Sequence, residues 1–177
     1  MGIGLVMVSN SSAENVKPPS LSSAEIDKIL SMTIIANLAT LGEDDTIHIV
    51  PMWFIRIGNY ICIPTSRHTL KYKNLKARPY ASVMIDISRE GLDLKGVLIR
   101  GPVEIVEGEE ARKINHQIHL KYVTEEGLNV PSVTSYLSKG DDVTVRIQMQ
   151  HIVNWNLAAS KAGRALRVKG RSRQLDA

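Results

Sequence analysis

Residues 47–64 read IHIVPMWFIRIGNYICIP, two apolar runs separated by Gly58-Asn59. A Gly-Asn pair between runs of branched and aromatic residues is typical of a tight β-hairpin. The stretch therefore predicts a strand over 47–57 and a partner strand over 60–64. Pro51 cannot donate a hydrogen bond to a neighbouring strand, so we expect the first strand to lie at a sheet edge or to contain a bulge.

Similar patterns on both sides of this hairpin predict further strands. Branched and apolar residues fill 33–41, 80–87, 94–106 and 142–155, which brings the expected number of strands to six. Helical spacing or composition predicts helices over 22–32, 70–77 and 109–122, and a short helical piece near Tyr136. The first of these helices begins with a capping-box pattern, Ser22 to Glu25.

Hairpin-linked strands with single helices between them predict a mainly β fold with peripheral helices. We expect a six-stranded antiparallel split β-barrel, with strands numerous enough to close. Side chains fill the interior of such a barrel, so a planar ligand must lie outside it, in a groove shared with a second subunit. The expected protein is therefore a homodimer.

The composition fits one globular domain. The chain has 177 residues, 44% hydrophobic and 23% charged, and no apolar run approaches the roughly 20 residues that span a bilayer. A single cysteine, Cys62, cannot form an internal disulfide. These features predict a cytoplasmic protein that is not inserted in a membrane.

The charge is concentrated at the end of the chain. Six basic residues and one acidic residue lie in 161–177, so the other residues sum to about −1 of the net +4. We expect a flexible lead at 1–20, a folded domain at 21–160 and a basic flexible tail at 161–177. A near-neutral body with 5% aromatic residues argues against a dedicated nucleic-acid module.

Residues 64–79, PTSRHTLKYKNLKARP, contain the candidate anion-binding groups, and we call this stretch the phosphate segment. Hydroxyl groups of Thr65, Ser66 and Thr69 surround Arg67 where a strand gives way to a helix. Lys71 and Asn74 are three residues apart and share one helix face. Hydroxyls, cations and helix N-terminal amides together form an anion site. On spacing alone, a solvated basic helix with an ordinary cap explains the segment equally well.

Several runs, in this order and spacing, resemble the pyridoxamine-phosphate-oxidase-like split barrels. They are Leu38-Ala-Thr40, His48–Phe54, Gly58, Tyr60–Ser66 and Lys71-x-x-Asn74-Leu75-x-x-x-Pro79. The resemblance covers about residues 22 to 160. It implies a flavin or deazaflavin cofactor.

The resemblance also implies which residues bind the cofactor. The ring system would lie along the second strand, which places Val50, Pro51, Met52 and Trp53 beside it. The phosphate would meet Thr65 and Lys71, with Ser66 and Asn74 from the same segment. Leu70 stands where the oxidases have an arginine, which leaves Arg67 as the candidate for the missing guanidinium. Trp155 matches a late tryptophan that approaches the cofactor.

The function implied is an FMN-binding oxidoreductase that moves a hydride between a reduced nicotinamide and a small acceptor. The Arg-Leu-His substrate motif of the oxidases is absent, since the chain reads Asn156-Leu-Ala. That absence argues against pyridoxamine phosphate as substrate, and no catalytic residue is assigned.

Two alternatives stay open. The first is a reductase that uses the deazaflavin coenzyme F-420, whose longer charged tail would suit Lys121, Lys161 and Arg164. The second is a non-catalytic flavin or haem binder, with His68 or His119 as axial ligand. His116 and His119 lie three apart, but no further ligands stand at a credible spacing, so no metal site is expected.

Overall fold

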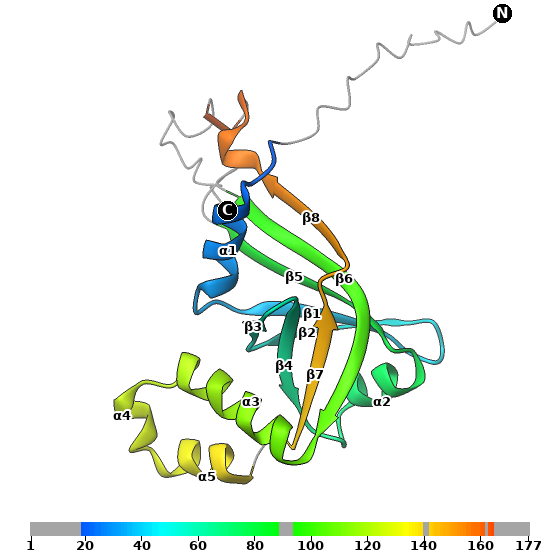
Figure 1. Ribbon diagram of the computed structural model, residues 1–177, viewed down its shortest axis with the longest axis vertical. Helices are drawn as coiled ribbons and strands as arrows, with labels where there is room; N and C mark the ends of the chain where they lie inside the picture. The colour runs from blue at the N-terminus through cyan, green and yellow to red at the C-terminus, as the bar shows by residue number, and fades with distance from the viewer. Residues whose placement is uncertain (1–18, 89–93, 140–141, 162, 165–177) are drawn as a thin grey trace, which may run out of the picture.

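The computed structural model describes residues 19–88, 94–139, 142–161 and 163–164. Within them lie eight strands (Figure 1): β1 Ala36–Leu41, β2 Ile47–Met52, β3 Ile55–Ile57, β4 Tyr60–Thr65, β5 Tyr80–Ser88, β6 Leu94–Glu107, β7 Val143–Gln148 and β8 His151–Asn156. The helices are α1 Ser23–Ser31, α2 Leu70–Ala77, α3 Gly108–Tyr122, α4 Glu125–Leu128 and α5 Pro131–Lys139, with a 3-10 turn at Leu157–Ala159.

All the strands form one antiparallel sheet in the order β2-β1-β5-β6-β7-β4-β3, with β8 also paired to β6. The mainly β fold with peripheral helices is therefore confirmed. The expected closure is wrong for the described strands, because β2 and β3 end the path without pairing to each other. Pro51 lies in β2 at one end of this path, as predicted for a strand that cannot donate at that residue.

Two predicted strands are each divided, which raises the number from six to eight. The run 47–57 splits at Trp53-Phe54, since β2 pairs with β1 while β3 pairs with β4. Phe54 is fully buried at this crossing. The run 142–155 splits at Met149-Gln150, with β7 and β8 pairing to different halves of β6.

Strand β6 holds the two halves of the sheet together. Residues 95–100 pair with β8 and residues 103–107 with β7. The change of partner occurs at Gly101, where an added Cβ would lie 1.9 Å from the backbone oxygen of Gln148. Only glycine permits this approach without a shift of backbone.

The predicted helices are present at their expected positions. Helix α1 has both hydrogen bonds of the capping box between Ser22 and Glu25. Helix α2 ends at Ala77, before Pro79. In Figure 1, α3, α4 and α5 lie to one side of the β4–β7 region and α2 to the other.

The core lies between the two halves of the sheet and beneath α1. Its largest fully buried side chains include Leu30, Leu38, Phe54, Ile61, Ile63, Ile85, Ile99 and Ile147. A smaller cluster beneath α3 joins Cys62 to Ile114 and Ile118. Burial raises the pKa of the Cys62 thiol to about 11, so Cys62 is a packing residue there.

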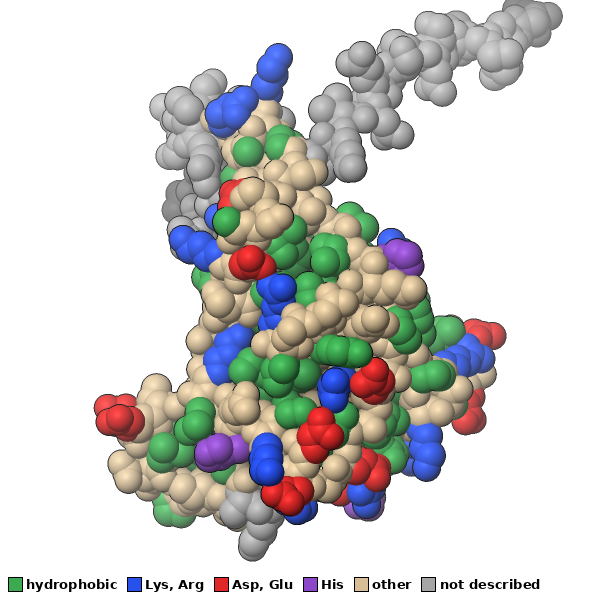
Figure 2. Space-filling model, in the orientation of Figure 1, with side chains coloured by type: hydrophobic (Ala, Val, Ile, Leu, Met, Phe, Trp, Pro, Cys, Tyr) green, Lys and Arg blue, Asp and Glu red, His purple; other side chains and the backbone are tan. Residues whose placement is uncertain are grey.

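Charges of both signs alternate over the face seen in Figure 2, with basic and acidic side chains adjacent over the β7 and α3 region. Arg146 of β7, for example, lies 3.1 Å from Glu110 and 3.6 Å from Glu104. Among the described residues of this face there is therefore no broad basic surface for a polyanion. No helix in the described ranges is both long and apolar enough to cross a bilayer.

Candidate functional site

The connection from β4 to α2 is fixed by its hydroxyl residues. Thr65 is buried, and its hydroxyl lies 3.0 Å from that of Thr69. Thr69 donates to the Ser66 carbonyl at 2.8 Å and accepts from the Tyr72 amide at 3.4 Å. Thr69 is thus the N-cap of α2. Ser66 is half-buried at the mouth of this turn.

Arg67 is turned toward two acidic side chains. Its guanidinium lies 3.1 Å from the Glu107 carboxylate and 3.5 Å from Asp142. Tyr72 donates to Glu107 as well, at 3.2 Å, and burial followed by this hydrogen bond raises the pKa of Tyr72. A phosphate contact from Arg67 would need the guanidinium to leave Glu107, so that role stays a prediction.

Lys71 and Asn74 have different surroundings, although they share a helix face. Asn74 is buried and donates to the Thr40 hydroxyl of β1 at 3.1 Å. Lys71 is half-buried in the first turn of α2, next to the Thr69 cap. Asn74 therefore anchors α2 to the sheet, while Lys71 has the position to reach a ligand at the helix N-terminus.

A shallow pocket adjoins the same helix. Its volume is about 390 Å³, and it is lined by Gly42, Glu43, Asp44, Thr46, His48, Leu70, Lys73 and Asn74. The pocket lies between α2 and the turn that joins β1 to β2. Hydrogen bonds from Thr46 lower the pKa of Asp44, so this end of the pocket carries negative charge.

The predicted ring-binding strand β2 lies at an edge of the sheet. Val50 and Met52 are half-buried and pack on the core, while Pro51 is exposed on the opposite face. The other edge of β2 pairs with none of the described strands. Its backbone amides and carbonyls are therefore available along the ring position that the resemblance implied.

Trp53 leaves β2 and packs against α3. Its ring stacks on Tyr122 at 5.1 Å with an interplanar angle of 7°, and it meets His119 edge-on at 6.2 Å. The Tyr122 hydroxyl accepts from the Phe54 amide at 3.3 Å and donates to the Ile34 carbonyl at 2.6 Å. One face of the Trp53 indole is thus occupied by Tyr122, and a role beside a cofactor stays a prediction.

Trp155 lies far from the other predicted residues along the sheet. Trp155 lies on β8, opposite Gly96 of β6. An added Cβ at Gly96 would lie 2.8 Å from the Trp155 ring. Four strand spacings separate β8 from β2 in the order β2-β1-β5-β6-β8, which is about 19 Å along the sheet. Within one chain the structure does not bring Trp155 together with Val50, Pro51 and Met52.

Residues of β2 and β8 lie on one face of the sheet, which we call the outer face. It is the face opposite the core. The strand register places on it the apolar side chains of Leu41, Ile47, Ile49, Pro51, Tyr80, Met84, Leu98, Val153 and Trp155, with the polar side chains of Asn37, Ser82, Asp86, Arg100 and His151 among them. Ile47 is 70% exposed and Ile49 61%. An apolar face of this extent marks an interaction surface. Sequence reasoning missed it, because alternation alone does not say which of two apolar faces is buried.

The histidines considered as ligands are placed differently. His119 is a buried residue of α3, whereas His68 is an exposed residue of the β4–α2 connection. No group of three or more His, Cys, Asp or Glu side chains suited to a metal is found in the described part of the chain.

The model of the family described as pyridoxamine 5'-phosphate oxidase matches residues 22–156. No curated protein sequence matches the chain significantly.

Solved structures with the same fold include the conserved hypothetical protein Rv2991 from Mycobacterium tuberculosis. It is 28% identical, with a TM-score of 0.62, over 77% of this chain and 86% of its own. A protein described as an F420 reductase is 23% identical, with a TM-score of 0.56, over 72% of this chain and 94% of its own. The heme storage protein HutZ from Vibrio cholerae is 18% identical, with a TM-score of 0.59, over 74% and 92%.

Proposed function

Because this chain belongs to the pyridoxamine 5'-phosphate oxidase family, we propose that it binds flavin mononucleotide as a homodimer and transfers hydride between that cofactor and a small substrate. The family binds flavins or deazaflavins. The observation that carries the proposal is the β4–α2 connection, which brings hydroxyls, a lysine and a helix N-terminus together, on a helix that shares a pocket with His48 of the edge strand β2.

The residues of this connection fit a terminal phosphate. The first amides of a helix have no acceptor within the helix, and the Thr69 side chain accepts only that of Tyr72. The helix dipole favours an anion at this end, and Lys71 in the first turn adds an ammonium group. Thr65, Ser66 and Lys71 would hold the phosphate.

The ring would then extend along β2, past Val50, Pro51 and Met52, where the unpaired strand edge offers backbone donors and acceptors to its polar atoms. A bound flavin supplies the hydride chemistry, so the protein has to orient the ring and shape the substrate space. Trp155 lies about 19 Å along the sheet from β2. It would meet this cofactor only from a second copy of the chain packed on the outer face.

A deazaflavin coenzyme is the second candidate, supported by the similarity to the F420 reductase. Such a coenzyme carries a longer charged tail beyond the phosphate. Lys161 and Arg164 are exposed just after Trp155, so in a dimer they would lie near the same groove. Lys121 lies instead in a pocket between α1 and α3.

Identification of the bound chromophore tests both candidates. We expect the purified protein, after denaturation, to release a yellow compound with the mass of flavin mononucleotide. The apoprotein is then titrated with flavin mononucleotide, riboflavin and coenzyme F-420, and the reduction of the loaded protein by a nicotinamide is followed by absorbance. Tighter binding of F-420 would select the second candidate. Binding of neither phosphorylated compound would contradict the proposal.

A further inference from the structure

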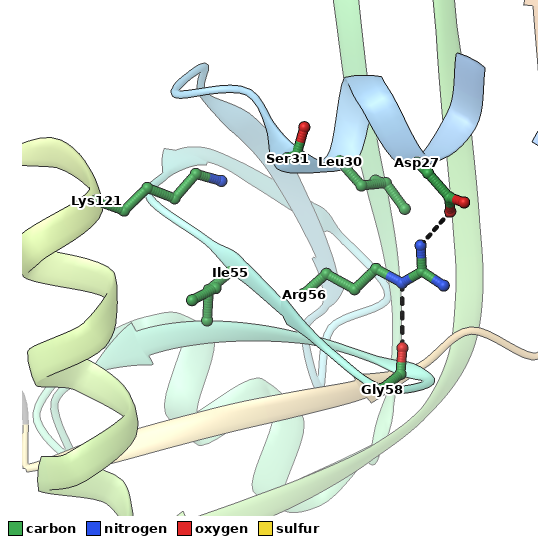
Figure 3. Close-up of a pocket in the computed structure, with 7 residues that line it drawn as sticks. All are labelled: Asp27, Leu30, Ser31, Ile55, Arg56, Gly58 and Lys121. Carbon is green, nitrogen blue, oxygen red and sulfur yellow. Dashed lines mark hydrogen bonds and ion pairs between the residues drawn. The ribbon is translucent and has the colours of Figure 1, made fainter. Parts of the chain in front are cut away.

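A second pocket lies at the other end of β4 from the phosphate segment (Figure 3). It has a volume of about 530 Å³ and lies between α1, the β3–β4 hairpin and the end of α3. Its lining residues are Asp27, Leu30, Ser31, Ile55, Arg56, Gly58 and Lys121. Volumes of this order are usual for small-molecule sites.

Lys121 provides a half-buried cation at this pocket. Its ammonium donates to the Phe54 carbonyl at 3.2 Å and lies 4.0 Å from the centre of the Phe54 ring. An ammonium has three donors, so this one protein bond leaves two for a ligand. In the described ranges of the chain, no carboxylate forms an ion pair with Lys121. Burial lowers the pKa of Lys121 to about 8, as expected for a cation whose charge is not compensated.

Arg56 carries the other positive charge, but this one is compensated. It forms an ion pair with Asp27 of α1, and its Nε donates to the Gly58 carbonyl at 3.1 Å. Figure 3 shows this pair at one end of the pocket and the Lys121 side chain reaching toward α1 from the other. The pocket therefore has one uncompensated positive charge.

Apolar groups separate these two ends. Leu30 is buried and Ile55 is half-buried, so a ligand body that contacts them gains from apolar burial. A dianionic phosphate would bring one charge more than Lys121 can balance. A single carboxylate on an apolar body matches both the charge and the lining.

We propose that this pocket binds small amphipathic carboxylates, with the carboxylate on Lys121 and the apolar body between Leu30 and Ile55. The pocket shares no lining residue with the proposed flavin site. Its lining residue Ile55 is opposite Cys62, three residues before Thr65, so this side of the pocket lies about 10 Å from Thr65 along β4. Neither cofactor loading nor activity is needed to test it.

The test uses 4-phenylbutanoate and its neutral amide as matched probes, with binding followed by NMR of isoleucine methyl groups. We expect 4-phenylbutanoate to shift the Ile55 methyl signal of the wild-type protein and to bind about tenfold more tightly than the amide, because only the carboxylate forms a charge-assisted bond. Lys121→Met should remove this difference, and Lys121→Arg should keep most of it. Lys113→Met is the control, since Lys113 is exposed on the same helix and pairs with Glu109.

Three results would overturn the proposal. One is equal binding of acid and amide to the wild-type protein, which does not depend on any variant folding. The second is unchanged 4-phenylbutanoate affinity in a folded Lys121→Met protein. The third is a failure of 4-phenylbutanoate to shift Ile55 up to its solubility limit.

Discussion

Lys71 is the residue on which the phosphate placement depends. If its ammonium contacts the terminal phosphate, Lys71→Ala removes a charge-assisted bond of roughly 1.5–3 kcal/mol, which weakens flavin mononucleotide binding about ten- to a hundredfold. Riboflavin, which lacks the phosphate, should bind the wild type and the variant equally. Fluorescence titration measures both affinities.

The matched control for this experiment is Lys76→Ala. Lys76 is exposed in the last turn of the same helix, away from its N-terminus, and should matter little to flavin mononucleotide binding. Equal affinity of the wild type and Lys71→Ala for flavin mononucleotide would leave α2 as an ordinary solvated helix.

The same helix shows how far residue spacing can predict a site. The spacing placed Lys71 and Asn74 on one face of α2, and the helix has the predicted bounds. The spacing could not show that Asn74 donates to Thr40, because that contact depends on how α2 packs against β1. Likewise, Glu107 and Asp142 lie far from Arg67 in the sequence, so their ion pairs with it were not predictable.

Lys121 should make stability depend on pH in a defined window. The pKa of Lys121 in the folded protein, about 8, lies below its ordinary value of 10.5, so between these values the unfolded chain binds the extra proton. The free energy of unfolding therefore increases as pH rises from about 8 to 10.5. Below about pH 8 the cation is protonated in both states, and the cost of burying it does not change with pH.

Comparison with Lys121→Met isolates this effect, because all other ionisable groups are present in both proteins. The variant's stability relative to the wild type should fall as pH rises from 8 toward 10. Urea unfolding at several pH values gives this difference directly. A difference that is constant across the window would show that Lys121 titrates at its ordinary value.

At the scale of elements, Gly101 is the position that the bend of β6 requires. Gly101→Ala would place a Cβ 1.9 Å from the Gln148 oxygen, which is backbone and cannot turn aside. We expect a loss of roughly 3 kcal/mol or more in the free energy of unfolding. Gly108→Ala is the matched control. Its φ is +71° but nothing lies within 4 Å of the added Cβ, so its cost is roughly 1–2 kcal/mol from conformation alone.

Thermal and urea unfolding of both variants separate steric from conformational cost. A Gly101→Ala protein as stable as Gly108→Ala would mean that β6 and β7 can move apart at this point without loss.

The divided strands show why the elements were predicted better than their partners. The apolar runs 47–57 and 142–155 are continuous in sequence, and most of their residues are in strands. Each run breaks where the chain changes the strand to which it is paired, at Trp53-Phe54 and at Met149-Gln150. Pairing partners are long-range contacts, which the local pattern does not contain.

For the whole molecule, the outer face is the surface on which a homodimer would form. It exposes Ile47 and Ile49 on β2, Met84 two strands away on β5 and Val153 on β8, and covering them removes apolar area from water. We expect sedimentation equilibrium to give a dimer. Ile49→Asp should dissociate it, because a charge would be buried without a partner.

Leu120→Asp is the control for this substitution. Leu120 is also exposed, at 56%, but lies on α3, away from the outer face. Dissociation by both substitutions, or by neither, would place the interface elsewhere.

A dimer of this kind predicts that each cofactor site uses Lys71 from one chain and Trp155 from the other. Lys71→Ala and Trp155→Ala homodimers should both bind flavin mononucleotide weakly, since every site in them has one defect. When the two variants are mixed and allowed to exchange subunits, each mixed dimer gains one site with both wild-type residues. With random exchange that is about one site in four. Titration with flavin mononucleotide should then show this fraction binding at wild-type affinity.

Two controls interpret the mixing experiment. In the first, the Lys71→Ala/Trp155→Ala double variant is mixed with wild type, and each site of the mixed dimers then has one defect. The fraction of tight sites should therefore not exceed that of the wild-type homodimers. Mixing without time for exchange should give no tight sites. If exchange is verified by mass and tight sites still do not appear, Trp155 does not reach the cofactor across the interface. The roughly 19 Å between β8 and β2 would then separate two unrelated sites on one sheet.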